Sequence, residues 1–168
     1  MQESKNRWNF VLRLDQIGVA LIPVVIGFLA LLNDMTSFSS TVKSTVMPLM
    51  TMQGQTEQLW RALPEGLVKP LYTLMFLGEF LVGVLAIIGV ILMLKNIHKD
   101  HDHFEKAKRW VYLACGWGIV VWGLGFFEIG GDWFLAWENN NLASFQQGSL
   151  MYVIEIAVVF IYLKLMRN

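Results

Sequence analysis

Four long apolar stretches limit most strongly what this chain of 168 residues can fold into. They cover roughly residues 14–32, 68–94, 110–130 and 149–166. Each is close to the roughly 20 residues that an α-helix needs to cross about 30 Å of hydrocarbon. A chain with 55 % hydrophobic and 15 % charged residues does not have the composition of a soluble domain. We therefore expect an all-α membrane protein, a four-transmembrane-helix bundle forming a single domain over residues 1–168.

The first apolar stretch follows several basic residues, as a secretory signal peptide would. It is longer than an ordinary signal core, however, and no small-x-small cleavage pattern follows it. We expect it to be an uncleaved first span.

Basic residues in the short loops predict the orientation of the bundle. Ten basic residues lie before the first span, between the second and third spans or after the fourth: Lys5, Arg7, Arg13, Lys95, Lys99, Lys106, Lys108, Arg109, Lys164 and Arg167. In a four-span bundle these three segments are on the same side of the membrane. The positive-inside rule predicts that this side is cytoplasmic. The last loop on the other side contains no Lys or Arg. Both termini are therefore expected in the cytoplasm. The formal net charge of zero gives no reason to expect a nucleic-acid partner.

The long first loop on the non-cytoplasmic side carries a helical pattern. Val42, Val46, Leu49 and Met50 follow helical spacing, and Pro48 would interrupt a regular helix. We expect a short amphipathic helix near the membrane surface, ended or kinked near Pro48, and a second short helix over about residues 56–62.

Aromatic residues are concentrated in the two non-cytoplasmic loops. The last loop contains Asp132, Trp133, Phe134 and Trp137, and the first contains Trp60 next to Arg61. Aromatic rings of this kind anchor proteins at the headgroup level, but exposed Trp and Phe clusters also form binding hot spots. Both interpretations remain open from the sequence.

Three predicted spans each carry one glutamate. Counting by three and four residues places Glu79, Glu128 and Glu155 on stripes that also contain small residues, which favour close helix packing. We expect all three side chains to face inward and to form a column of acids in the non-cytoplasmic half, with Arg61 able to reach it. The column could organise the bundle, or it could bind a cation or pass a proton. A gap of apolar residues separates it from Asp15 at the other end.

Other reactive side chains give weaker signals. His98, His101 and His103 could meet on a metal only if their helix breaks after His101, so a solvated loop is the better interpretation. Cys115 inside the third span suits a buried packing residue. The sequence contains no recognisable catalytic motif, and we expect a protein without enzymatic activity, cofactor or metal.

Several short motifs resemble one known family. "NDMTSF" after the first span, "WRALP" before the second, "GE" within it and "GGDWFLAWE" after the third are similar to the bacterial predicted small integral membrane proteins of domain-of-unknown-function family 2165. The resemblance extends over nearly the whole chain. It implies a four-span protein of the bacterial inner membrane with no assigned activity. The two non-cytoplasmic loops would then be periplasmic.

Two functional hypotheses follow. In the first, the protein recognises a membrane or periplasmic protein, as an accessory subunit or a toxin-immunity protein does. Contact would be made by Trp60, Arg61, Asp132, Trp133, Phe134 and Trp137, with the acids behind them. In the alternative, a small channel or transporter conducts protons or cations by means of Glu79 and Glu155. It would act as a homo-oligomer, because four spans enclose little room.

Overall fold

The computed structural model describes residues 2–138 and 142–166, with side chains from Trp8 onward. Its long helices are α1 Gln2–Thr41, α3 Glu65–Lys95, α4 His101–Gly118 and α5 Ala143–Leu165, and the part described contains no strand. Four helical segments are long and apolar enough to cross a membrane: Trp8–Met50, Glu65–Lys95, His101–Trp133 and Ala143–Leu165. The expected all-α architecture, with four helices of membrane-spanning length and composition, is confirmed. Arg167, used in the orientation argument, lies outside the described residues, as do the side chains of Lys5 and Arg7.

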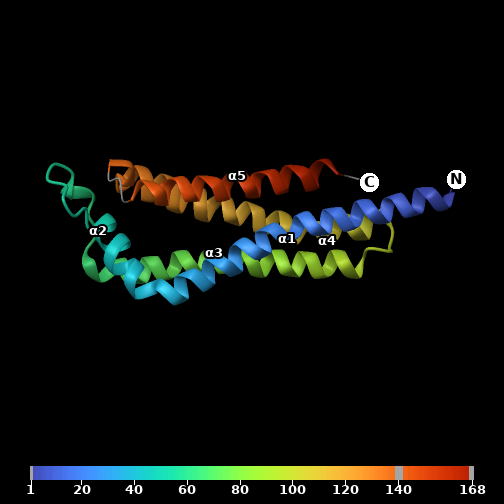
Figure 1. The fold of residues 1–168 in the computed structure, drawn as a ribbon, viewed down its shortest axis with the longest axis horizontal. Helices are drawn as coiled ribbons and strands as arrows, with labels where there is room; N and C mark the ends of the chain where they lie inside the picture. Colours follow the sequence, from blue (N-terminus) through green and yellow to red (C-terminus); the bar gives the residue numbers. More distant parts are fainter. Residues whose placement is uncertain (1, 139–141, 167–168) are drawn as a thin grey trace.

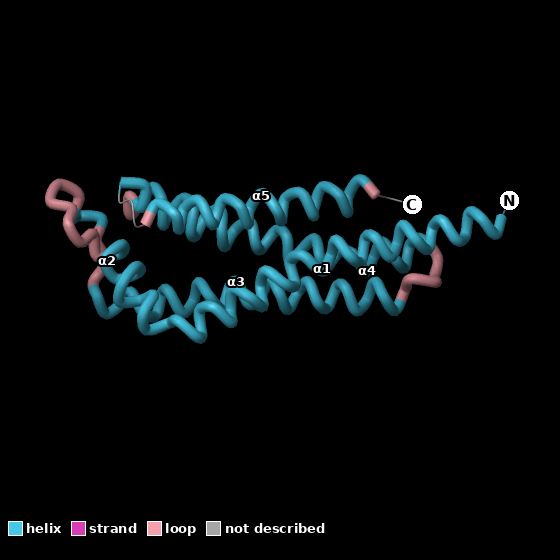
Figure 2. The backbone as a smooth tube through the Cα atoms, in the orientation of Figure 1, coloured by secondary structure: helices cyan, strands magenta, loops and turns pink. Residues whose placement is uncertain are grey.

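The long helices run side by side along the longest axis of the molecule (Figure 1). α1 crosses the bundle, so that it packs mainly against α3 and also contacts α5. The N- and C-terminal helix ends lie at the same end as the turn between α3 and α4, and we call this the terminal end. The other two connections gather at the opposite, loop end (Figure 2). Which membrane face each end occupies remains a prediction.

The first loop differs from the prediction. Instead of a separate surface helix, residues 42–50 prolong α1 through a π-helical segment, η1 Val42–Val46, and a single turn, α2 Met47–Met50. α2 ends at Met50, two residues after Pro48, which agrees with the expected end of the helix near this proline. The second expected helix is reduced to the 3₁₀ turn η2 Leu59–Arg61.

Glycines bring α1 and α3 into backbone contact, as the small-residue stripe in the second span predicts. A Cβ atom on Gly27 would meet the backbone of Gly83 and lie 2.9 Å from the carbonyl oxygen of Glu79. One on Gly83 would lie 3.3 Å from the backbone nitrogen of Phe28. Membrane helices pack this closely only where small residues allow it. The close contact also fixes the height of Glu79 relative to α1.

The third span is unusual in its second half. α4 continues without a break into η3 Ile119–Trp133, a π-helix of 15 residues. π-helical turns are rare, usually single, and frequent at functional sites. Because their hydrogen bonds run from residue i to i+5, three- and four-residue spacing no longer keeps side chains on one face. The orientation of side chains toward the end of this segment therefore departs from an α-helical prediction, although Val121 near its start is buried as that spacing predicts.

Candidate functional site

Glu79 lies inside the bundle, as the sequence predicts. It is in the middle of α3 and is 5 % exposed. The indole Nε1 of Trp122, on η3, donates a 2.7 Å hydrogen bond to Glu79 Oε1. The carboxyl group of Asp34, on α1, lies near Glu79, and both residues line one cavity. Three helices thus contribute to one polar cluster.

Asp34 is the residue that the sequence argument missed. The apolar stretch of the first span ends near residue 32, so Asp34 lies beyond it in the sequence. In the structure α1 continues to Thr41 and brings this side chain between the helices. The hydroxyl of Tyr72 donates a 2.6 Å hydrogen bond to Asp34 Oδ1, and Phe38 stacks on the Tyr72 ring at 5.4 Å. These contacts fix the position of Asp34.

A cavity of about 220 Å³ opens beside the two carboxyl groups. Its walls come from α1, α3, η3 and α5, and they combine the acids with four aromatic rings and two serines: Ala30, Asn33, Asp34, Glu79, Trp122, Phe126, Ser144, Phe145, Gly148, Ser149 and Tyr152. The rings of Trp122 and Tyr152 lie 5.3 Å apart. A water molecule takes up about 30 Å³ in the liquid, so the volume suits several waters or one small organic molecule.

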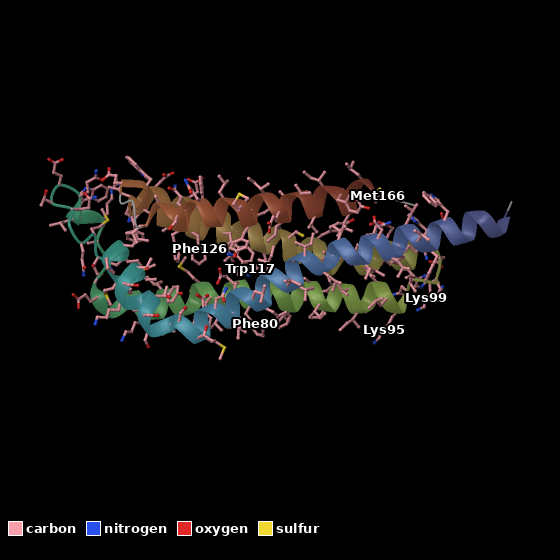
Figure 3. All side chains as sticks on the ribbon, viewed as in Figure 1. Phe80, Lys95, Lys99, Trp117, Phe126 and Met166 are labelled. Carbon is pink, nitrogen blue, oxygen red and sulfur yellow. The ribbon has the colours of Figure 1, made fainter. Side chains whose placement is uncertain are left out.

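Two indoles hold α3 at the cavity. Trp117 Nε1, on α4, donates to the carbonyl oxygen of Gly78 at 3.0 Å, and Trp122 binds the next residue, Glu79. Trp117 lies near the middle of the bundle (Figure 3). Indole N–H groups in an apolar setting require an acceptor, and here both acceptors belong to consecutive residues of one helix.

An apolar layer lies between the cavity and the terminal end. Its buried side chains come from all four spans and include Ala20, Val82, Ala86, Ala114 and Ile156, each 0 % exposed. Beyond this layer, Asp15 accepts a hydrogen bond from Tyr162. The apolar gap between Glu79 and Asp15, expected from the sequence, is therefore present.

Glu128 does not join Glu79, which corrects the prediction of an acid column. Its side chain is exposed, because it lies in the π-helix η3. The sequence argument counted residues by α-helical spacing from Ala114. That spacing fails within a π-helix, and Glu128 turns away from the interior.

Glu155 is also exposed, so the predicted column contains only one of its three members. The buried face of α5 is formed by Ser149, Ile156, Val159 and Leu163. Glu155 precedes Ile156 and points away from this face. α5 is apolar around its whole circumference, and so residue spacing alone could not determine which side packs inward.

Arg61 connects the two loops at the loop end instead of reaching the acids. Its Nη1 donates to the carbonyl oxygens of Asp132 and Trp133, each at 3.2 Å, and Trp133 Nε1 donates to the Arg61 carbonyl at 3.3 Å. The guanidinium lies over the rings of Trp60 and Trp133, 5.0 and 5.9 Å from their centroids. We call this group the Trp60–Arg61–Trp133 cluster.

The remaining predicted contact residues separate into two groups. The side chains of Asp132 and Trp137 are exposed at the loop end. Phe134, in contrast, is buried in a small second core with Val46, Leu49 and Leu142. It follows the last residue of η3, and its ring packs under the loops. Phe134 is therefore a packing residue in this structure, and its ring is not available to a partner.

The histidines of the α3–α4 turn have separate partners. His98 stacks on Phe10 with ring centroids 5.2 Å apart, whereas Nδ1 of His103 lies 2.6 Å from Asp100 Oδ1. Asp100 is the N-cap of α4 and accepts the backbone N–H of His103, which holds the pKa of that carboxyl below its usual value.

The apolar helices and the polar cluster enclosed between them define an integral membrane protein with four candidate spans. The chain belongs to the family described as predicted small integral membrane protein (DUF2165), whose model matches residues 12–166. The resemblance of the sequence motifs is thus confirmed. Comparison with curated proteins and with solved structures found no match.

Proposed function

We propose that this protein binds a small organic cation of the ammonium class in the cavity beside Asp34 and Glu79. The observation that carries the proposal is the meeting of two carboxyl groups in an aromatic-lined cavity of about 220 Å³ within the membrane-spanning helices. Intramembrane acids generally mark ligand or ion sites. Ammonium groups bind both carboxylates and the faces of Trp, Tyr and Phe rings.

The charges around the cavity support a cationic ligand. No Lys or Arg is among the residues that line it, and Arg61 is bound to the loop carbonyls instead. Adjacent carboxylates repel each other unless a cation or a proton lies near them. Trp122 and Tyr72 donate one hydrogen bond each to the pair, which leaves carboxyl oxygens able to accept from a ligand.

Binding is better supported than conduction. The apolar layer that includes Ala86 and Ala114 separates the acids from the terminal end, and Glu155 lies outside the cavity. A hydrated cation has no polar partners along this layer. We therefore propose a binding protein without catalytic activity.

Titration with tetramethylammonium chloride tests the proposal. A ligand that binds only the folded state raises the unfolding temperature as its concentration increases. We expect tetramethylammonium to raise the unfolding midpoint of the detergent-solubilised protein above that in sodium chloride of the same ionic strength. In liposomes, potassium flux should equal that of protein-free vesicles. Equal midpoints in both salts would refute the binding proposal, and flux above the vesicle background would refute the proposed lack of conduction.

Recognition of a protein partner is a second candidate function, favoured by the exposure of Glu155. By helical rise this carboxyl lies about 18 Å from the start of α5 and about 15 Å from its end, near the centre of a bilayer. A lipid-facing acid at this depth is costly unless another group covers it. A second membrane protein could cover Glu155 with a helix that carries a cation or a hydrogen-bond donor. This protein would then act as an accessory subunit of that partner, or as an immunity protein that binds it. The Trp60–Arg61–Trp133 cluster would supply a further contact at the loop end.

Replacing Glu155 with leucine tests this second function. We expect the Glu155→Leu variant to lose a partner that co-purifies with the wild-type protein in mild detergent, as measured by light scattering and mass spectrometry. Val158→Leu is the matched control, because Val158 is also exposed on α5, one turn further along. A particle of the same mass and composition in wild type and Glu155→Leu would exclude Glu155 as the contact.

A further inference from the structure

A second cavity lies at the terminal end, far from the acid pair. It has a volume of about 390 Å³ and is lined by Asn9, Phe10 and Arg13 of α1 and by Ile97, His98 and Lys99 of the α3–α4 turn. This cavity is lined by basic side chains, whereas the one beside Glu79 is lined by acidic ones. The proposed cation site does not use any of these residues.

Arg13 fixes the shape of this terminal cavity. Its Nη1 donates to the carbonyl oxygens of Ile97 and Lys99 at 2.7 and 2.6 Å, which ties α1 to the turn. The guanidinium also lies 4.9 Å from the centroid of the Phe104 ring. The stacked rings of Phe10 and His98 form one wall. The walls are therefore held together before any ligand arrives.

One donor of Arg13 has no acceptor. Its Nε is shielded from solvent and makes no hydrogen bond to any part of the chain that the structure describes. A buried donor without a partner costs free energy, and most such groups in proteins are satisfied. The other N–H groups of this side chain are the ones open to a ligand, because Arg13 lines the cavity and guanidinium groups bind phosphate and carboxylate oxygens with several N–H groups at once.

The charge of the surrounding surface favours an anion. Segments 8–16, 95–110 and 162–166 contain seven Lys or Arg and four Asp or Glu residues. Three of the acids already have partners: Asp15 binds Tyr162, Asp100 binds His103 and Glu105 binds Lys108. Lys95 and Lys99 both lie at this end of the bundle (Figure 3). The excess positive charge would attract an anion to the cavity.

We propose that the terminal cavity binds a phosphate group, either in the headgroup of an anionic phospholipid or in a soluble phosphate compound. Arg13 and Lys99 supply the positive charge, and Asn9 and His98 supply further polar contacts. The position of the cavity at the end of the membrane-spanning helices is consistent with a headgroup, because basic pockets at this depth bind anionic lipids.

The test measures the unfolding midpoint of the protein in a neutral detergent in the presence of each of four additives. These are dioctanoyl-phosphatidylglycerol, dioctanoylglycerol as its phosphate-free control, sodium phosphate, and sodium chloride at the ionic strength of the phosphate. We expect the phosphate-containing lipid to raise the midpoint and dioctanoylglycerol not to do so. In Lys99→Gln the affinity should fall about tenfold, the loss typical of one charge-assisted hydrogen bond. Lys95→Gln should stay within about twofold of wild type, because Lys95 lies at the same end but does not line the cavity.

The outcomes separate the two sources of phosphate. Stabilisation by the lipid alone assigns the cavity to a headgroup, whereas stabilisation by sodium phosphate as well assigns it to phosphate groups in general. The proposal is overturned if neither compound stabilises the protein more than its control. It is also overturned if Lys95→Gln weakens binding as much as Lys99→Gln, since the attraction would then come from the surface charge as a whole.

Discussion

Replacing Gly27 with alanine is expected to destabilise the bundle by about 3 kcal/mol, at the upper end of the usual cost of overpacking. The added Cβ would meet the backbone of Gly83 and the carbonyl oxygen of Glu79. Backbone atoms within a helix cannot move aside as a flexible side chain can, so α1 and α3 must separate. The thermal unfolding midpoint in detergent, and unfolding in mixed detergent micelles, measure the effect.

Gly18→Ala is the matched control for this prediction. Gly18 lies on the same helix, and nothing is within 4 Å of a Cβ built on it. In a helix interior, alanine is also about 1 kcal/mol more favourable than glycine. The Gly18→Ala variant should therefore be at least as stable as the wild-type protein. If the two variants unfolded at the same temperature, the close contact between α1 and α3 would not contribute to stability.

Replacing Glu79 with glutamine is expected to weaken tetramethylammonium binding at least tenfold. Glutamine has nearly the same shape and retains an oxygen that can accept from Trp122, but it cannot carry the negative charge that attracts a cation. Opposite unit charges about 5 Å apart attract each other by about 3 kcal/mol at an effective dielectric constant of about 20, and a loss of about 1.4 kcal/mol corresponds to tenfold in affinity. Isothermal titration of the purified variant measures the change directly.

Glu128→Gln controls for the loss of one negative charge. Glu128 is an exposed acid on η3, outside the cavity. Its removal alters the net charge by the same amount as the Glu79 variant, and its expected effect on binding is less than about twofold. An equal loss in both variants would mean that the cation responds to the overall charge of the protein. Unchanged binding in Glu79→Gln would remove Glu79 from the site.

The four spans were predictable because hydrophobic length is a direct requirement of the bilayer. The first three apolar stretches inferred from the sequence lie inside helical segments, and the fourth extends one residue past the end of its segment. The burial of Glu79 was predictable for a related reason. Small residues such as Gly83 and Ala86 follow it at helical spacing, and such residues mark the side on which membrane helices pack.

The rest of the site depends on structure that residue patterns do not encode. Asp34 could not be paired with Glu79, because the extension of the first helix beyond its apolar part has no strong sequence signal. Glu128 was placed wrongly since hydrophobic periodicity does not reveal a π-helix. Glu155 was placed wrongly because lipid and protein neighbours favour the same apolar residues, so that the inward face of α5 is not distinguished by composition.

The two indole bonds to α3 also restrict how this helix can move. Trp117 and Trp122 donate to Gly78 and Glu79, so α3 cannot rotate about its own axis or slide along the third span without breaking both bonds. The direction of the Glu79 carboxylate is therefore set by the Trp122 indole before anything binds. If the cavity admits a ligand, the motion that admits it must come from α1 or α5, while α3 and the third span move as one rigid body.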